Sequence, residues 1–481
     1  MPLLRRMKKP LARFTQFATN LFPHEVYYLQ SVQNFQNPEN HEIMTVMLYN
    51  LEHRQKPKKY PSRIDKRKYS NLKKWIEQKL AEANVDEQLR TITQLETKVL
   101  LDEVDVATEK EVQRWLRLGT PRHHYFRKIY ELLRHYEHFL LIRLREKTDE
   151  KVNAYLQKYR SQYEQSETIF QKLQGITSEI VGQYHSRSKQ LNAHEQFLRE
   201  VLYHPQLDGM NQYAAFVRLA FIYLNTGQRK PLEEIYAFMD EAFKQGRFYS
   251  RRILANFYAN RLLMLSRFSS LDEAEQFGYL SLRFKNTDYL FYLTNLSAVL
   301  LRQGKSEEAL QLLREAFPEL RQTSNRHTKI GFIAFYLKCM TDLGRAADAE
   351  DFAESYLKAY PKEVLGSRWH LFFVAYFRAL MIQEKYGRLL YLTKRFKILQ
   401  REKSNKNRPS YLPTISWYVA LARYVDEALS AEDLEAEMSL ALSGNTQWTS
   451  RKNRLLAIFE ELKPVDPKVI KSIQSALLAD I

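Results

Sequence analysis

Residues 291–317 show the most regular pattern of hydrophobic and polar positions in the chain, and this pattern predicts two short amphipathic helices joined by a tight turn. Leu293, Leu296 and Leu300 recur at helical spacing and form one apolar stripe. Gly304 then stands where a left-handed residue would end the first helix, because glycine adopts that conformation without steric cost. The apolar face of the second helix follows at helical spacing: Ala309, Leu312, Leu313, Ala316 and Phe317.

A similar helix–turn–helix pattern recurs from about residue 211 onward. Gly344 and Ala349 repeat the spacing of Gly304 and Ala309, and Pro361 closes that copy. An irregular bundle with chance spacing is the alternative, because helix pairs of average length also repeat at about 40 residues. The residues that open the apolar face of successive second helices lie 35 to 44 positions apart: Ile235, Ala274, Ala309, Ala349, Leu390 and, with a looser match, Leu434.

This pattern resembles the tetratricopeptide (TPR) repeat over roughly residues 200–450. A TPR repeat has 34 residues, so most of these copies must carry longer helices or loops. The resemblance implies a superhelix of stacked helix pairs, whose first helices line a concave face that holds a partner. The matching positions in the best copy are Asn295, Leu296, Ser297, Gly304, Glu308, Ala309 and Ala316.

Composition favours helix along the whole chain. Only 13 glycines and 15 prolines occur among 481 residues, and strand-like runs between turn signals are missing. We therefore predict an all-α protein, a TPR-like α-solenoid of stacked antiparallel helix pairs preceded by an N-terminal helical region. The expected domains are an N-terminal helical region with a basic start (1–204), the repeats (205–463) and a C-terminal capping helix (464–481). Gly175 and Gly182 are predicted helix breaks within the first region.

Cys339 is the only cysteine, which excludes a disulfide or a cysteine-based zinc site within one chain. We expect its side chain to be buried as a small hydrophobic group. The N-terminus lacks the apolar core of a signal peptide, and no run of about 20 apolar residues occurs. These features predict a cytoplasmic protein without a transmembrane segment.

The net charge of +18 is concentrated in two segments. Residues 1–74 hold 15 lysines and arginines against 5 carboxylates, and residues 388–408 hold 8 against 1. Such patches can meet phosphates or other anions, and Tyr60, Tyr69 and Trp75 could stack on unpaired bases. Tyr69 and Trp75 also stand at core spacing, and a solvated basic surface is the plainer interpretation. The candidate residues are Arg54, Lys56, Lys58, Lys59, Arg63, Lys66, Arg67, Lys68, Lys394, Arg395, Lys397 and Arg401.

Alignment of the two best copies also predicts a partner-binding groove. Asparagine can donate to and accept from a peptide backbone, and arginine can hold a carboxylate. The lysines that clamp a C-terminal carboxylate in the best-known TPR sites have no counterpart here, so an amphipathic helix or extended hydrophobic segment is the favoured ligand. Ordinary solvated polar residues on an exposed helix face are the alternative. The groove candidates are Asn256, Asn260, Arg267, Phe291, Asn295 and Arg302.

The leading functional prediction is a non-catalytic scaffold or adaptor that binds a peptide or helix of another protein. The runner-up is a nucleic-acid-associated factor that uses residues 1–74 and 388–408, and a third class is a regulatory enzyme with its chemistry in the N-terminal region. Phosphate-binding loops, dinucleotide motifs and nucleophile elbows are absent from the sequence. We predict no cofactor and no metal site, although His135 and His138, at i and i+3, could ligate one ion and lie close to His123 and His124.

Overall fold

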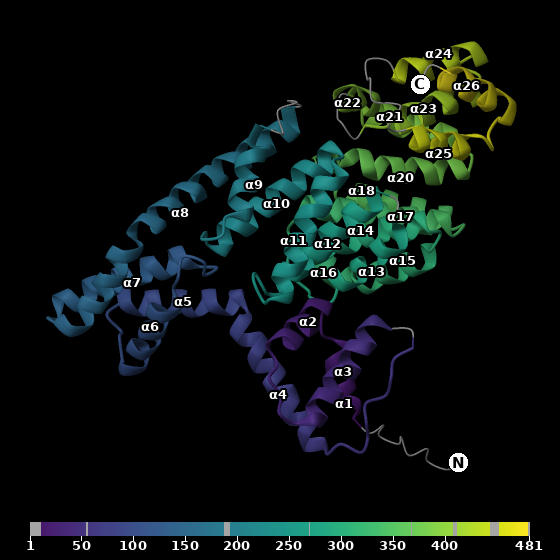
Figure 1. Cartoon of the computed structure of the whole chain (residues 1–481). Helices are drawn as coiled ribbons and strands as arrows, with labels where there is room; N and C mark the ends of the chain where they lie inside the picture. The colour runs from purple at the N-terminus through teal and green to yellow at the C-terminus, as the bar shows by residue number, and fades with distance from the viewer. Residues whose placement is uncertain are drawn as a thin grey trace. The chain divides into compact units, whose positions relative to one another are not determined.

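The computed structural model describes residues 11–53, 56–186, 193–268, 270–366, 368–406, 411–442 and 452–479. Within these ranges the chain forms 26 helices and no strand, which confirms the all-α prediction (Figure 1). Contacts within the chain define two compact units, Met1–Arg261 and Leu262–Ile481, called unit 1 and unit 2 below. Among the described residues, none of the helices is both long enough and apolar enough to cross a membrane.

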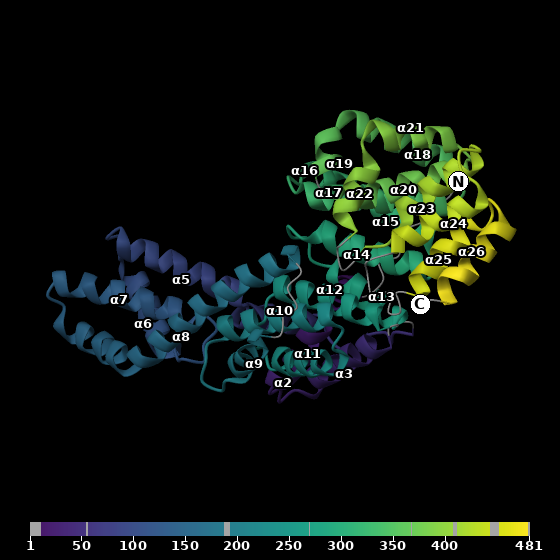
Figure 2. The same ribbon diagram turned by 90° about the horizontal axis from the view of Figure 1, so that it is seen from above.

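Unit 1 contains α1 (Ala12–Thr19), α2 (Pro23–Val32), α3 (Pro38–Glu52), α4 (Lys66–Ala83), α5 (Val85–Leu100), α6 (Val106–Leu118), α7 (Phe126–Ile142), α8 (Glu146–Ser186), α9 (Glu195–Tyr203), α10 (Gly209–Thr226) and α11 (Arg229–Lys244). The next helix, α12 (Arg251–Arg267), crosses the division between the units. α7 and α8 lie side by side in both ribbon views (Figure 1 and Figure 2).

Polar contacts tie α2 to the helices near residue 250, far away in the sequence. The Glu25 carboxylate, fully buried, accepts from the Tyr249 hydroxyl at 2.6 Å and from the Arg251 guanidinium at 2.7 Å. His24 lies 2.9 Å from a carboxylate oxygen of Asp240 in α11. The chain therefore divides after Arg261, whereas the sequence places its first boundary after residue 204.

The long helix α8 differs from the sequence prediction. It runs for 41 residues through both Gly175 and Gly182, so the predicted breaks there are wrong. A glycine inside a helix costs only about 1 kcal/mol relative to alanine, and packing around α8 offsets that cost. Leu173 is fully buried, and Arg218 of α10 donates to its carbonyl oxygen at 3.1 Å.

Unit 2 contains α13 (Leu271–Ser281), α14 (Tyr289–Arg302), α15 (Ser306–Glu315), α16 (Phe317–Gln322), α17 (Arg326–Asp342), α18 (Ala346–Ala359), α19 (Pro361–Gly366), α20 (Trp369–Ile382), α21 (Tyr386–Arg395), α22 (Ile398–Asn405), α23 (Thr414–Val425), α24 (Ala431–Leu442), α25 (Lys452–Leu462) and α26 (Pro467–Ala479). Cys339 is fully buried in the core of this unit, as predicted, and burial raises its thiol pKa to about 12.

The helices of unit 2 pack in a repeating order. The long helices α14, α17, α20 and α23 form a row in which each packs against the next. Each following helix (α15, α18, α21) packs against the long helix before it and the long helix after it. α26 lies against α24 and α25 at the end of the chain, where the sequence predicts a cap.

The same backbone turn ends each long helix. The amide of Lys305 donates to the carbonyl oxygen of Leu300 at 2.9 Å, and Arg345 does the same to Met340 at 2.9 Å. Gly304 has a φ of +74°, so the left-handed conformation predicted for it is confirmed. This geometry is the Schellman motif, which satisfies the last carbonyl groups of a helix.

The spacing near 40 residues has a structural cause. A short third helix (α16, α19 or α22) follows the second helix in three successive copies and lengthens each beyond 34 residues. The turn after α20 also sets the register of α21: Leu389, four residues beyond the turn amide of Lys385, is fully buried, as Ala309 is after Lys305. The predicted opener Leu390 is therefore wrong by one position.

Candidate functional site: the basic surface of α21 and α22

The basic residues near position 395 lie where α21 ends and α22 begins. Phe396 packs against Phe373 with ring centroids 5.9 Å apart, and Ile398 is fully buried. Lys397 between them has a φ of +52°, which reverses the chain and starts α22. Because the two apolar neighbours point into the core, Lys397 projects outward and is exposed.

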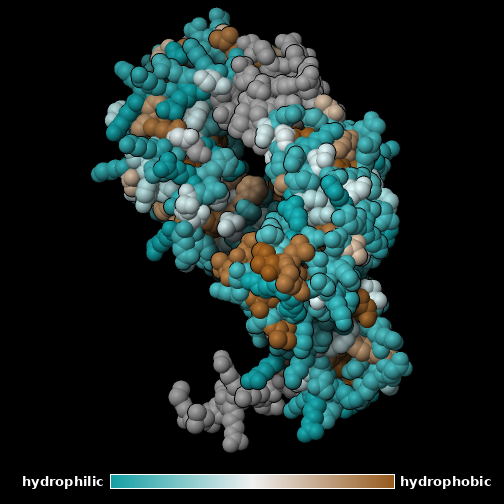
Figure 3. All heavy atoms as spheres, turned by 90° about the vertical axis from the view of Figure 1, so that its left-hand side faces the viewer, coloured by the Kyte–Doolittle hydropathy of each residue, from teal (hydrophilic) through white to brown (hydrophobic). Residues whose placement is uncertain are grey.

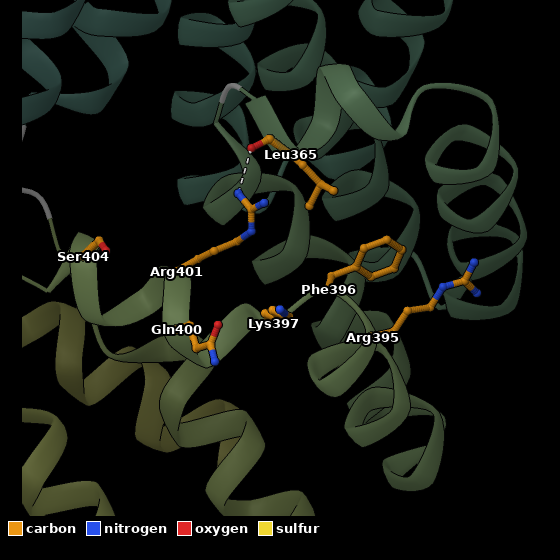
Figure 4. Close-up of a pocket in the computed structure, with 7 residues that line it drawn as sticks. All are labelled: Leu365, Arg395, Phe396, Lys397, Gln400, Arg401 and Ser404. Carbon is orange, nitrogen blue, oxygen red and sulfur yellow. Dashed lines mark hydrogen bonds between the residues drawn. The ribbon is translucent and has the colours of Figure 1, made fainter.

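A hollow of about 420 Å³ lies beside this turn (Figure 4). Its floor includes Leu365, the next-to-last residue of α19, whose carbonyl oxygen accepts from Arg401 at 3.1 Å. The lining residues are Leu365, Arg395, Phe396, Lys397, Gln400, Arg401 and Ser404. Three of the four cations predicted for the second basic patch thus line one hollow, with the Arg395 guanidinium pointing away from Arg401 (Figure 4), and Lys394 precedes Arg395 in the sequence.

The charge of this surface is not neutralised by neighbouring carboxylates within the described ranges. There, no ion pair joins a carboxylate to Lys394, Arg395, Lys397 or Arg401. Glu402, the single carboxylate of residues 388–408, is only 3% exposed. A buried carboxylate attenuates the positive field from below but leaves the exposed cations open to an incoming anion.

The hollow is suited to an acidic group. A guanidinium binds a carboxylate or phosphate through two parallel hydrogen bonds, and lysine adds a point charge. Gln400 and Ser404 add neutral donors on the same side of α22, and Phe396 and Leu365 supply an apolar wall. This combination can hold a negatively charged side chain together with the apolar stem that carries it.

The first basic patch is partly neutralised. Arg63 pairs with Glu42 at 2.5 Å, Lys68 lies 3.7 Å from Glu39, and the Lys58 ammonium sits 3.7 Å from the centre of the Tyr49 ring. The remaining members of this patch, Lys56, Lys59, Lys66 and Arg67, are exposed. Arg54 lies outside the described residues.

The aromatic residues of that patch serve the core. Tyr69 is 2% exposed and Tyr60 is 9% exposed, and both pack around Phe14. The Trp75 ring packs edge-on against Phe35 at 4.7 Å. Tyr60 and Tyr69 are therefore not available for stacking on bases.

The groove candidates lie on α12 and α14. Asn260 donates to the Asn256 side chain at 2.8 Å, so these two side chains are partly occupied with each other. On α14, Phe291 and Asn295 are partly exposed one turn apart. Arg302 is exposed at the end of that helix and donates to the carbonyl oxygen of Ser266 at 2.7 Å.

Helix α25, the last but one, covers part of the long-helix row. Arg378 of α20 lies 3.2 Å from Glu461, and the buried Tyr418 hydroxyl of α23 donates to Glu461 at 2.6 Å. Partial burial and the nearby guanidinium of Arg454 lower the pKa of Arg267. The chain itself thus occupies the α20–α23 part of the row, whereas Phe291 and Asn295 on α14 stay partly open.

The histidines predicted as weak metal candidates have other surroundings. His135 lies 3.3 Å from Glu96, and burial lowers the pKa of His123 to about 4 and that of His124 to about 3. The ring nitrogen Nδ1 of His123 accepts from the amide of Tyr125 at 3.1 Å. Across the residues that the structure describes, no group of three or more histidine, cysteine, aspartate or glutamate side chains is placed to hold a metal ion.

Sequence analysis identified the cations of the candidate site but not its remaining walls. Leu365 lies 36 positions before Arg401 in the chain, and no spacing rule connects the two residues. Ser404 could have been found from the sequence, because it lies three residues after Arg401 and four after Gln400 on one helix. No family model, no curated protein and no solved structure matches this chain.

Proposed function

We propose that this chain is a non-catalytic scaffold that binds another protein, and that the basic surface of α21 and α22 holds an acidic segment of that partner. The observation that supports it best is the hollow lined by Arg395, Lys397 and Arg401, which face no carboxylate among the described residues. Clusters of arginine are a recurrent way to recognise acidic or phosphorylated motifs.

The helix packing supports a scaffold of the TPR-like kind. The long-helix row and the repeated turn at Leu300–Lys305 and Met340–Arg345 are what stacked helix pairs require. In such an array the long helices line the binding face, and here Phe291 and Asn295 are the partly exposed members on α14. We infer that an amphipathic segment of the partner contacts α14 on this face, separately from the acidic segment held by α21 and α22.

A binding assay with matched charge reversals tests the acidic-segment proposal. The probe is a fluorescein-labelled peptide of ten glutamates, followed by anisotropy at low salt. Lys394→Glu with Lys397→Glu should weaken binding at least about tenfold, because two exposed cations, which form no ion pair within the described ranges, become anions. The control is Lys358→Glu with Lys362→Glu, which reverses two exposed lysines of the same unit. Equal losses in both variants, or no loss in either, would contradict the proposal.

Nucleic acid is the second candidate ligand. The observation that favours it is the charge of residues 1–74 and 388–408, which hold 15 cations against 5 carboxylates and 8 against 1. A single-stranded DNA probe of equal charge, run beside the peptide, separates the two. Nucleic-acid binding should fall steeply between low and moderate salt, and tighter binding of DNA than of peptide at both salt concentrations would replace the protein-partner proposal.

A further inference from the structure

Apolar side chains gather at one end of unit 1, where α5 meets α6 and α7 meets α8. Each member exposes between 54% and 85% of its surface. The apolar tip, as we call it, consists of Leu100, Leu101, Val106, Leu141, Ile142 and Leu144. A compact group of hydrophobic residues is visible on the side of the molecule where the α7–α8 corner lies (Figure 3).

Two ion pairs hold the corners of the apolar tip together. The Arg143 guanidinium lies 3.0 Å from Asp102, and Arg145 pairs with Glu109 near the start of α6. The guanidinium of Arg143 also sits 3.8 Å from the centre of the Phe139 ring. The exposed leucines on both corners are therefore presented as one surface and not as two independent loops.

Leu144 is the most exposed apolar residue of the tip. This residue has a φ of +53° and is 85% exposed. A bulky residue in the left-handed region is strained, and glycine or asparagine would fit the turn at lower cost and be more soluble. The left-handed turn ends α7, because the Arg145 amide donates to the Leu140 carbonyl oxygen at 3.1 Å. An exposed leucine at that position adds to an apolar patch of the kind that contacts another molecule.

We propose that the apolar tip is a self-association surface, on which a second copy of this chain docks about a two-fold axis. Its six members each expose more than half of their surface and form an apolar centre. A standard interface buries about 800 Å² per partner and surrounds such a centre with a polar rim, which the charged residues around the tip can supply. Dimer interfaces are also more apolar than the average protein surface.

The charges around the tip fit the same partner. Glu103 on the α5–α6 corner and Lys147 on the α7–α8 corner are both exposed, and neither pairs with a charged group in the described part of the chain. In a two-fold interface, residue i of one copy meets residue j of the other, and j meets i. Glu103 of each copy can therefore pair with Lys147 of the other.

An anionic membrane fits the tip less well. Peripheral membrane binding to anionic lipids relies on an excess of lysine and arginine around the inserted apolar groups. The two corner segments, residues 97–110 and 138–151, hold 6 lysines and arginines against 7 carboxylates. Without an excess of cations, the tip is better matched to a neutral protein surface such as its own copy.

Sedimentation velocity of the full chain over a concentration series tests this proposal. The wild type should sediment as a dimer at about 50 µM, and Leu101→Asp with Leu144→Asp should convert it to a 57.3 kDa monomer. Both side chains are more than half exposed, so the fold does not depend on them. The control, Ile382→Asp with Val425→Asp, changes exposed apolar residues of unit 2 and should leave the dimer intact.

A charge exchange provides the second measurement. Glu103→Lys and Lys147→Glu should each weaken the dimer at least about fivefold, and the double exchange should restore it, because it re-forms the Glu103–Lys147 pair across the two-fold axis with the charges exchanged. A monomeric wild type at about 50 µM, a dimer that survives the aspartate substitutions, or binding to neutral phosphatidylcholine vesicles in place of dimer formation would each overturn the proposal. Lack of rescue in the double exchange would also overturn it.

Discussion

The backbone amide of Lys385 donates to the carbonyl oxygen of Leu380 at 3.0 Å, across a glutamate in the left-handed conformation. That residue, Glu384, has a φ of +57°. The equivalent bond from Lys305 to Leu300 crosses Gly304, at +74°. The same helix-ending turn therefore forms with and without glycine, and the tertiary packing of the long-helix row must offset the steric cost at Glu384.

Replacing Glu384 with glycine should stabilise unit 2. The strain of a non-glycine residue in the left-handed region is about 1 kcal/mol, and part of this gain is lost to the greater freedom of glycine in the unfolded chain. We expect the free energy of unfolding in urea to rise by about 0.5 kcal/mol for Glu384→Gly. Gly304→Ala should lower it by about 1 kcal/mol. A rise in the free energy of unfolding for Gly304→Ala would show that the left-handed turn at position 304 does not need glycine.

Close packing between α13 and α14 requires a glycine at position 278. A Cβ atom there would lie 2.6 Å from Leu296 and 2.8 Å from Leu262, both core side chains. Gly278→Ala should therefore lower the free energy of unfolding by about 1–2 kcal/mol, even though alanine favours helix. Gly175→Ala is the matched control, because nothing lies within 4 Å of its Cβ position in α8. That variant should be more stable by about 0.5–1 kcal/mol.

The buried carboxylate of Glu25 holds α2 in place. It accepts from Tyr249 and Arg251, and also from the amide of Phe22 at 2.8 Å, which caps α2. Glu25→Gln removes the charge that these donors stabilise, and the free energy of unfolding should fall by about 2–3 kcal/mol. Glu39→Gln, at an exposed ion pair, should change it by less than about 0.5 kcal/mol. If chemical denaturation gave the same change in the free energy of unfolding for Glu25→Gln and Glu39→Gln, the contacts of Glu25 with Tyr249 and Arg251 would not be made.

Acid should destabilise unit 1 through two partly buried histidines. Burial lowers the pKa of His123 to about 4 and of His124 to about 3, below the value of about 6.5 in an unfolded chain. The unfolded state therefore binds protons first as pH falls below 6.5, and each histidine contributes a loss of about 1.4 kcal/mol per pH unit down to its folded pKa.

A single substitution isolates the contribution of His123. In His123→Asn the amide oxygen can still accept from Tyr125, while the titrating group is removed. Denaturation curves at pH 7, 6 and 5 should show a shallower loss of stability for this variant than for the wild type. An exposed control, His41→Asn, should leave the slope unchanged. If the free energy of unfolding of the wild type did not change between pH 7 and pH 5, the two rings would be protonated as readily in the folded state as in the unfolded state.

Local sequence patterns were sufficient to mark where several helices of this fold begin or end. Pro23 and Pro38 stand at the first positions of α2 and α3, and Gly304 and Gly344 end α14 and α17 in the left-handed conformation. These features depend on residues within one or two helical turns, so the sequence contains the whole interaction. Prediction failed where a local rule competed with packing, as at Gly175, where contacts from α10 keep α8 continuous.

By itself, the sequence determined that the chain is helical, that Gly304 and Gly344 end two of the helices, and that its cations fall into two segments. Only the tertiary structure decided that Tyr60 and Tyr69 are buried, that Glu402 lies beneath the basic surface, and that Leu365 completes the hollow beside Arg401. The reason is physical. Helix formation depends on hydrogen bonds between neighbours four residues apart, whereas burial and charge pairing depend on groups that approach across tens of positions and follow no short period.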